Sequence, residues 1–423
     1  MMLGTIPAAM GAGRSGIRRL IGSGFLGAEA VFARASRATS FDASSLLSDV
    51  AADVPRFPGT ARRLMIEGAR TNGVRNPRAE GGAPGTLGAG GSAPSNWTLG
   101  VGSTGLLPVI SYGTENGLPY LQLDVSGVPT GTSSVDVFCD TTSAIAAAPS
   151  QSLVFSAFLK LHAGSLAGVA TDNRVQFYNS VPTFLSDTGA SATWGGGGLG
   201  TSRFQHPVTA VADTAFVRSR LRFNLTSGVA VSFTVRMAAP AFETGAFASS
   251  PILPPALMVA AATRAADILT ASVAALFPAG AGTLLWSGTI PQAAPAGVEQ
   301  ILAQLDAGSD SNRIRLRNAA GGLTLVADFI AGGVAAGTLT LGSMVAGVPF
   351  KVALAWSGTG LSGLLAGGTV QTASATAPAG LTTLRFGNNV AGASGLFGEV
   401  ASASALSYRA GDASLSTLLG ALS

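Results

Sequence analysis

Few residues of this 423-residue chain are suited to acid–base or nucleophilic chemistry. The chain has 21 acidic residues, two histidines (His162 and His206) and one cysteine, Cys139. Glycan hydrolysis commonly needs two carboxylates about 5 to 9 Å apart across a cleft, and no pair of acids stands in an aromatic-rich stretch. The histidines and the cysteine lack zinc-ligand spacing, and no nucleophile elbow is present. We therefore expect no catalytic residue and no cofactor, so that the protein is not an enzyme.

Asp306 and Asp310 come nearest to a cluster of metal ligands. They belong to the run Leu-Asp-Ala-Gly-Ser-Asp-Ser-Asn at residues 305–312. Carboxylate oxygens bind Ca²⁺, but a turn of this composition is more commonly a solvated hairpin loop. The sequence favours the loop and leaves these two residues as weak calcium candidates.

An exposed aromatic side chain with polar neighbours can stack on a sugar ring. Trp194 is the best candidate because four glycines follow it at residues 195–198, with Arg203 and His206 close in sequence. The alternative is that the indole anchors its loop beneath a sheet. We treat Trp194, Arg203 and His206 as candidate glycan-binding residues, although a buried structural role is the more common one for a histidine.

Three arginines, Arg218, Arg220 and Arg222, occupy alternate positions within residues 216–224. A period of two predicts a half-buried strand. Its basic face suits an acidic polysaccharide or a neighbouring subunit, and a plain solvated face is equally consistent with the pattern. Residues 229–237 continue the same period after Thr-Ser-Gly, which predicts a hairpin between the two strands.

Similar short strands recur along most of the chain. Turn residues separate them and no helical period appears, which predicts an all-β protein with two antiparallel β-sandwich (jelly-roll) domains. Further strands are expected at residues 119–125, 134–138, 153–161, 174–178, 283–287, 301–305, 313–317, 323–330, 338–341, 350–356, 361–365, 381–386 and 396–407. Residues 412–419 predict one short helix with Asp412 as its N-cap.

The composition indicates a folded chain whose charge is unevenly distributed along the sequence. Only 11% of residues are charged, but 47% are hydrophobic and 20 are Phe, which argues against disorder. Residues 1–78 hold eleven Arg and five acids, so a whole-chain net charge of +4 leaves the remainder slightly negative. The arginines lie among Gly and Ala without aromatic residues, which favours docking on an acidic protein surface over nucleic-acid binding.

No membrane insertion is expected either. The first charged residues follow the apolar start of the chain, which is the reverse of a secretory signal. Residues 256–277 are apolar but are interrupted by Arg264 and Asp267. We expect an extended basic arm over residues 1–75, a first sandwich over 76–250, a Pro-rich linker over 251–270 and a second sandwich over 271–423.

Several ordered blocks in the first hundred residues resemble a known class of proteins. The blocks are Ala-Arg-Ala-Ser-Arg-Ala-Thr at 33–39, Val-Pro-Arg-Phe at 54–57, Leu-Met-Ile-Glu-Gly-Ala-Arg-Thr-Asn at 64–72 and Arg-Asn-Pro at 75–77, with Trp97 downstream. They resemble the leader of virion-surface proteins of phages, prophages and gene transfer agents, including tail fibres and head spikes. The sequence departs from that pattern at Pro58-Gly59-Thr60, where an Asp-rich turn is usual.

This resemblance implies a particle-binding N-terminal part followed by sandwiches of carbohydrate-binding-module and concanavalin-A-like (LamG-like) type. The attachment residues it implies are Arg34, Arg37, Arg56, Phe57, Arg62, Arg63, Glu67 and Arg70. The implied partners are other virion proteins, at a portal or capsid vertex or at a tail or baseplate, and host cell-surface polysaccharide.

The expected function is a spike or fibre subunit, a homo-oligomer on the virion surface that is assembled in the bacterial cytoplasm and binds host glycans. The alternatives are a purely structural baseplate or decoration protein and, less favoured, a polysaccharide depolymerase.

Overall fold

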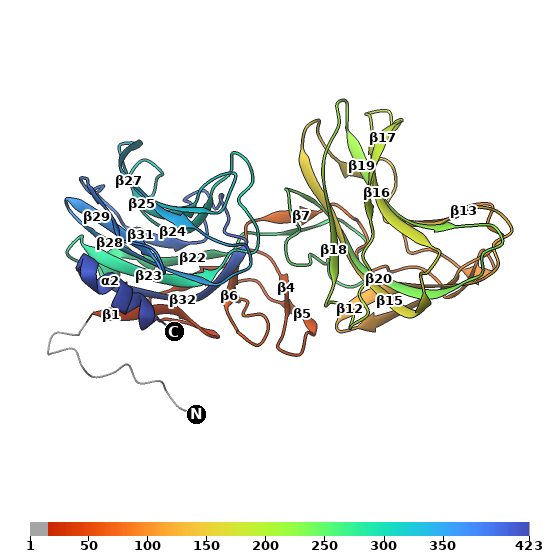
Figure 1. Ribbon diagram of the computed structural model, residues 1–423, viewed down its shortest axis with the longest axis horizontal. Helices are drawn as coiled ribbons and strands as arrows, with labels where there is room; N and C mark the ends of the chain where they lie inside the picture. Colours follow the sequence, from red (N-terminus) through yellow and green to blue (C-terminus); the bar gives the residue numbers. More distant parts are fainter. Residues whose placement is uncertain (1–15, 423) are drawn as a thin grey trace. The chain divides into compact units, whose positions relative to one another are not determined.

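A computed structural model describes residues 16–422, which fall into two compact units built almost entirely of β-strands (Figure 1). The terminal unit contains residues 16–37, 50–69 and 265–422 of the described chain. The inserted unit contains residues 38–49 and 70–264. The all-β fold predicted from the strand periodicity is confirmed.

The inserted unit is a sandwich of a seven-stranded and a six-stranded sheet. The seven-stranded sheet has the order β18 (Arg203–Thr209), β15 (Ser152–Ser165), β20 (Val231–Thr244), β12 (Leu118–Gly127), β11 (Val109–Glu115), β8 (Gly85–Leu87), β9 (Gly90–Gly91). The six-stranded sheet has the order β10 (Thr98–Val101), β13 (Ser133–Phe138), β19 (Phe216–Leu225), β16 (Ala170–Tyr178), β17 (Phe184–Ser191), with β14 (Ile145–Ala146) also on β19. Two small ladders complete the unit: β4 (Ala38–Phe41) with β5 (Leu47–Val50), and β7 (Arg70–Asn72) with β21 (Ala262–Arg264).

The core of the inserted unit lies between these two sheets. Phe223 of β19 and Phe233 of β20 stack across it with ring centroids 5.3 Å apart. The strand predicted at residues 216–224 is therefore confirmed, but the predicted hairpin is wrong because β19 and β20 belong to opposite sheets. Each strand buries alternate residues in the same core, so the period is shared although the strands are not paired.

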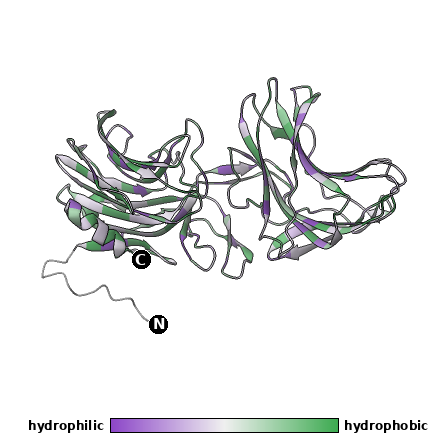
Figure 2. Cartoon of the chain, viewed as in Figure 1, coloured by the Kyte–Doolittle hydropathy of each residue, from purple (hydrophilic) through white to green (hydrophobic). Residues whose placement is uncertain are grey.

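The terminal unit is a second sandwich. Its eight-stranded sheet has the order β2 (Phe25–Leu26), β1 (Ile17–Gly22), β32 (Gly398–Leu406), β23 (Gly282–Thr289), β28 (Phe350–Ser357), β29 (Gly360–Leu365), β30 (Gln371–Ser374), with β6 (Leu64–Ile66) also on β32. Its seven-stranded sheet has the order β27 (Val334–Ser343), β26 (Thr324–Ala331), β25 (Arg313–Asn318), β24 (Gln300–Asp306), β31 (Thr383–Phe386), β22 (Ile268–Ser272), β3 (Val31–Ala33). Hydrophilic and hydrophobic residues both occur along the strands of each unit (Figure 2).

Among the described residues, three short helices belong to the terminal unit: α1 (Val273–Leu276), the 3-10 helix η1 (Asp412–Ser414) and α2 (Leu415–Gly420). The helix predicted near the C-terminus is thus present, with a different start. Asp412 is the first residue of η1, its side chain makes no N-cap bond, and its carboxylate accepts from Arg409 at 2.9 Å. None of the helices in residues 16–422 is long and apolar enough to cross a membrane.

The structure divides the chain differently from the predicted arm, linker and sandwiches. Strands β1, β3 and β6 of the predicted arm pair with β32, β22 and β32 of the C-terminal sandwich. Ile252 and Leu253 of the predicted linker are buried. The described residues of the arm therefore belong to sandwiches, because their apolar side chains complete sandwich cores whose other strands lie far away in sequence.

A buried charge cluster ties these distant segments of the terminal unit together. Asp267 accepts from Arg34 Nη1 at 3.0 Å and from Arg56 Nη2 at 2.6 Å, and all three side chains are fully buried. Its carboxylate also accepts from the Glu67 backbone N–H at 2.9 Å, and its carbonyl accepts from Asn388. Arg56 also pairs with Glu67 at 2.9 Å.

Candidate functional site

The structure does not bring the predicted glycan-binding residues together. Trp194 is half-buried: its indole N–H donates to Thr171 Oγ1 at 2.9 Å, and its ring lies 5.4 Å from the ring of Phe223 in the core. These contacts match the alternative interpretation, in which the indole anchors its loop.

His206 and Arg203 lie on opposite faces of β18. His206 is buried, and its Nδ1 lies 2.9 Å from Asn173 Oδ1, while burial lowers its pKa. Arg203 lies over the ring of Phe158, donates to Ser156 Oγ at 2.9 Å and donates to the carbonyl of Ser249. Both side chains are held by neighbouring residues, so neither offers an obvious surface for a sugar.

Arg218, Arg220 and Arg222 share the face of β19 that points away from the core, since Val217, Ser219, Leu221 and Phe223 on the other face are buried. They lie in a network with acids of neighbouring strands. Arg222 Nε pairs with Asp136 at 3.0 Å, and Arg220 Nη2 pairs with Asp187 at 3.4 Å. Of the predicted glycan-binding residues, these three arginines are the ones that the structure places together on one outer face of a sheet.

The weak calcium candidates have other partners. Asp306 is buried and accepts from Arg385 Nε at 2.7 Å and from the Gly308 N–H at 2.9 Å. Asp310 pairs with Arg313 at 2.6 Å. Nowhere in residues 16–422 do three or more His, Cys, Asp or Glu side chains gather as potential metal ligands.

The predicted attachment residues divide into buried and accessible groups. Arg34, Arg56 and Glu67 are buried around Asp267, so these three side chains do not face a partner, contrary to the prediction. Phe57 is half-buried against the core of the terminal unit. The side chains that remain wholly or partly exposed are Arg37, Arg62, Arg63 and Arg70, of which Arg63 pairs loosely with Glu399 and Arg70 lies over Phe247.

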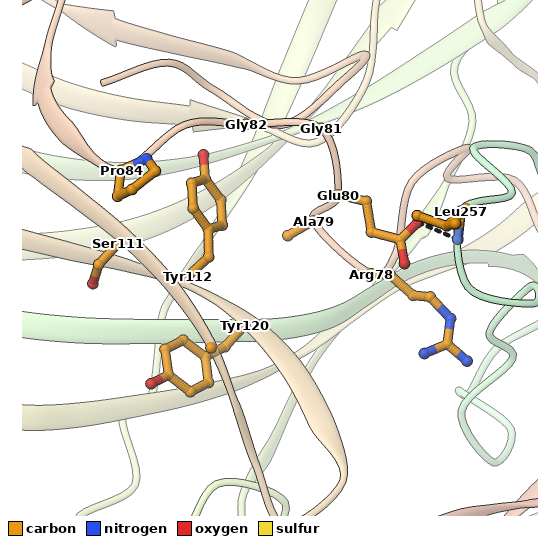
Figure 3. A pocket seen from close by; sticks show the side chains of 11 residues that line it. Arg78, Ala79, Glu80, Gly81, Gly82, Pro84, Ser111, Tyr112, Tyr120 and Leu257 are labelled. Carbon is orange, nitrogen blue, oxygen red and sulfur yellow. Dashed lines mark hydrogen bonds between the residues drawn. The ribbon is translucent and has the colours of Figure 1, made fainter. Parts of the chain in front are cut away.

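A pocket of about 450 Å³ lies in the inserted unit, beside the edge of β11 (Figure 3). Strand β8 covers only Val109 and Ile110 of β11, which leaves the following residues at the sheet edge. The segment 78–84 runs along this edge. The pocket is lined by Arg78, Ala79, Glu80, Gly81, Gly82, Pro84, Ser111, Tyr112, Gly113, Tyr120 and Leu257.

Asn76 fixes the loop that forms one wall of the pocket. Its amide donates to the carbonyls of Glu80 and Ser95 at 2.9 and 2.8 Å, and its Oδ1 accepts from the Glu80 N–H at 3.0 Å. Trp97 Nε1 donates to the Asn76 carbonyl at 3.1 Å. The Arg-Asn-Pro block and Trp97, which the sequence singled out, thus serve to hold this wall.

Two tyrosines form the aromatic part of the pocket. Tyr112 donates to the Ser92 carbonyl at 2.6 Å, and burial raises its pKa to about 12, so the phenol is neutral. Tyr120 lies opposite Gly113 in the β11–β12 ladder. A Cβ at Gly113 would lie 2.5 Å from the Tyr120 hydroxyl oxygen, so glycine is needed for the ring to lie across the strand.

Charged groups line the pocket, and one more contacts the ring of Tyr120. Arg78 Nε donates to the Pro254 carbonyl at 2.6 Å, and Glu80 accepts from the Leu257 N–H at 2.7 Å (Figure 3). The guanidinium of Arg236 lies 4.4 Å from the ring centre of Tyr120. Aromatic faces bordered by fixed hydrogen-bonding groups are suited to a sugar, whose C–H faces stack while its hydroxyls bond.

Behind Tyr120, Glu115 holds two cations. Its two oxygens accept from Lys160 Nζ and Arg236 Nη1, each at 2.6 Å, and one also accepts from the Leu199 N–H at 2.7 Å. Burial alone would raise the pKa of Glu115, but these bonds lower it to about 2. The cluster keeps Arg236 in place under the ring.

Sequence reasoning missed this pocket although one signal was present. Asn116-Gly117 connects β11 to β12, and both residues have positive φ, 51° and 76°, as a type I′ hairpin turn requires. Such a turn predicts which strands pair and in which register, with Tyr112 opposite Leu121 and Tyr120 opposite Gly113, so that the two tyrosines project from opposite faces of the hairpin. The loop 78–84 carries no comparable signal.

Comparisons with known proteins give only distant β-sandwich similarities. No protein-family model matches the sequence, and no curated protein sequence matches it. One solved structure that resembles it is the CBM40 of a Ruminococcus gnavus IT-sialidase, with 14% identity, a TM-score of 0.28 and coverage of 33% of this chain and 83% of that one. Another is the enzymatically active domain of bacteriophage CBA120 tailspike protein 4, with 15% identity, a TM-score of 0.27 and coverage of 36% of this chain and 20% of that one. A tandem CBM22 domain of Paenibacillus barcinonensis Xyn10C matches more of the chain, with 9% identity, a TM-score of 0.22 and coverage of 78% of this chain and 99% of that one. Because all three TM-scores are low, the architecture is assigned from the chain's own sheets.

Proposed function

We propose that this protein is a virion structural protein, a spike or fibre subunit whose inserted unit binds host surface glycans. The observation that carries the glycan-binding part is the pocket beside β11, in which Tyr112 and Tyr120 stand among Arg78, Glu80 and Ser111. The particle assignment rests on the resemblance of the leader blocks to those of virion-surface proteins.

The same pocket favours binding over hydrolysis. Glu80 is the one carboxylate among its lining residues, and its Oε2 already accepts a backbone N–H. A glycosidase of the usual kind needs a second carboxylate across the cleft. We therefore propose a binding protein without enzymatic activity.

Attachment to the particle is proposed through the terminal unit and the N-terminal segment, with other virion proteins as partners. The excess of arginine in residues 1–78 and the exposed side chain of Arg62 support an acidic docking surface. We further propose that the subunit is a homo-oligomer on the virion surface, since spikes and fibres that resemble it are of this kind.

The test is binding of the purified protein to polysaccharide from its host, with variants that alter the pocket. Ser111→Trp fills the pocket without removing a core side chain, and Tyr120→Ala removes a stacking face. Each should weaken binding about tenfold, or roughly 1.4 kcal/mol. Tyr408→Ala, at an exposed tyrosine of the terminal unit, is the matched control and should bind as the wild type does.

Three results would contradict the proposal in different ways. Shortening of the polysaccharide chains by the wild-type protein would support a depolymerase. Absence of any glycan binding, with the protein still present on purified particles, would support a purely structural decoration or baseplate protein. Absence of the protein from particles would contradict the virion assignment itself.

A further inference from the structure

Among the described residues, one arginine on the outer face of the six-stranded sheet has no acidic partner. The face carries four arginines (Arg174, Arg218, Arg220 and Arg222) and three aspartates (Asp136, Asp172 and Asp187). Arg174 pairs with Asp172 and Asp187, each at 3.0 Å, and the Arg220 and Arg222 pairs are those described above. Within residues 16–422, no carboxylate lies within ion-pair distance of Arg218.

Arg218 is nevertheless held in one orientation by neutral groups. Gln176 Oε1 accepts from its Nε at 3.1 Å and from its Nη2 at 2.8 Å, and the Tyr178 hydroxyl lies 2.9 Å from Nη2. Its guanidinium lies 4.2 Å from the ring centre of Phe138. These contacts occupy Nε and Nη2, while Nη1 makes no hydrogen bond to any described residue.

The terminal unit supplies an internal comparison. Arg313, Arg315 and Arg317 also occupy alternate positions of one strand, β25. Each of them has a carboxylate partner: Asp310 at 2.6 Å, Asp328 at 2.6 Å and Asp328 at 3.1 Å, respectively. All three arginines of β25 are therefore paired with carboxylates, whereas Arg218 of β19 has no such partner within residues 16–422.

Aromatic surface adjoins the cation. The Phe184 ring packs edge-on against Tyr178, with centroids 5.9 Å apart, and Phe184 is 50% exposed. A sugar ring placed against Phe184 would have its carboxylate close to a guanidinium that is already oriented. Charge-assisted bonds to a fixed arginine are stronger than neutral ones, because little side-chain freedom is lost on binding.

We infer that Arg218 binds the carboxylate of an acidic sugar, which makes the outer face of the six-stranded sheet a second glycan site, selective for acidic polysaccharides. This inference rests on the proposed glycan-binding function and adds the class of ligand. The free Nη1 donates to the carboxylate, and the exposed ring of Phe184, which packs on the buried Tyr178, supplies the apolar surface beside it.

The decisive variant is Gln176→Glu, which puts a carboxylate where Gln176 Oε1 already accepts from Arg218. It preserves the packing and strengthens the hold on Arg218, yet it neutralises the cation. Gln371→Glu, on strand β30 of the terminal unit, makes the same chemical change elsewhere and is the control. Arg218→Gln removes the guanidinium and gives an independent second variant.

Binding is measured by affinity electrophoresis in gels that contain alginate, a polymer of uronic acids, or dextran, which is neutral. Gln176→Glu and Arg218→Gln should each weaken alginate binding at least about tenfold, and Gln371→Glu should leave it unchanged. Dextran mobility should be the same for all variants. A folded Gln176→Glu protein that binds alginate as tightly as wild type would overturn the inference.

The outcome separates this inference from the proposed function. If the wild type binds host polysaccharide through the pocket and shows no retardation by alginate, the acidic-sugar site is refuted and the proposed function stands. If the wild type binds neither host polysaccharide nor alginate, the proposed function has failed and the inference fails with it.

Discussion

Asp267 and Arg56 form a fully buried ion pair of 2.6 Å, although 211 positions separate them in the chain. Arg34 completes the arrangement on the other oxygen of the same carboxylate. Three segments that enter the terminal unit separately, around residues 34, 56 and 267, are thereby held at one point. A block that resembles an attachment motif is therefore also an element of the fold.

Replacing Asp267 by Asn should destabilise the terminal unit strongly. Two buried guanidinium groups would lose their shared anion, and removing one partner of a buried pair costs about 3 to 5 kcal/mol. The measurement is the free energy of unfolding from urea titration. Asp310→Asn, which removes a partly exposed pair with Arg313, serves as control and should change that free energy by less than about 1 kcal/mol. Equal effects of the two substitutions would contradict a central role for Asp267.

Deletion of residues 1–60 should prevent the terminal unit from folding. The deletion removes β1 and β3 from its two sheets and leaves Asp267 without Arg34 and Arg56. We expect an insoluble product or one that lacks a cooperative unfolding transition in circular dichroism. A deletion of residues 1–15 retains all these strands and is the matched comparison. If the larger deletion instead yields a stable, soluble protein with both sandwiches intact, the assignment of β1 and β3 to the terminal unit is wrong.

The Glu115 cluster predicts an acid-dependent loss of stability in the inserted unit. Because the pKa of Glu115 is lowered from 4.5 to about 2, its contribution is complete above pH 4.5 and disappears as the pH falls through about 2. Wild type should therefore be more stable than Glu115→Gln at pH 7, and the difference should shrink between pH 4.5 and 2. Urea titrations across this range provide the measurement. A difference that does not depend on pH would show that the charge of Glu115 is not what stabilises the cluster.

The hydrogen bonds of Lys351 indicate that its replacement should destabilise the end of the C-terminal helix. Its Nζ donates to the Leu419 carbonyl at 3.3 Å and to the Leu422 carbonyl at 2.5 Å, at the end of α2. Lys351→Met should weaken this end by about 1 kcal/mol, because a cation that bonds the last carbonyls of a helix is lost. Hydrogen exchange of the peptide covering residues 411–422 should become faster. Lys160→Met alters the chain's other lysine, in the inserted unit, and should leave that peptide unchanged.

The sequence allowed the strands to be predicted better than their partners. The alternation around Arg220 located β19 correctly, because burial on one face imposes a period of two wherever the strand lies. It did not show that β20 belongs to the opposite sheet, since both strands face the same core. Pairing mostly depends on residues far apart in the chain, and the local signals for it are short hairpin turns such as Asn116-Gly117 and Gly332-Gly333.

The candidate sites show the same limit. The spacing of Arg218, Arg220 and Arg222 can be recognised in the sequence because a period of two is a local pattern. The sequence does not show that Arg218 lacks an acidic partner, because this depends on where Asp136 and Asp187 of the neighbouring strands lie. The resemblance of the leader blocks implies an attachment role for Arg34 and Arg56, and the sequence does not reveal that they are buried against Asp267, which lies more than 200 positions away. The sequence does not single out Tyr112 and Tyr120, because they line a pocket only together with the loop at residues 78–84.

Strands β7 and β21 pair so that Arg70 lies opposite Arg264, at the two ends of the long segment of the inserted unit. The entry and exit points of that segment are therefore neighbours in one ladder, which is the geometry in which one domain can be spliced into another without breaking the host. Residues 70–264, which make up the inserted unit together with residues 38–49, thus begin and end at one place in that unit.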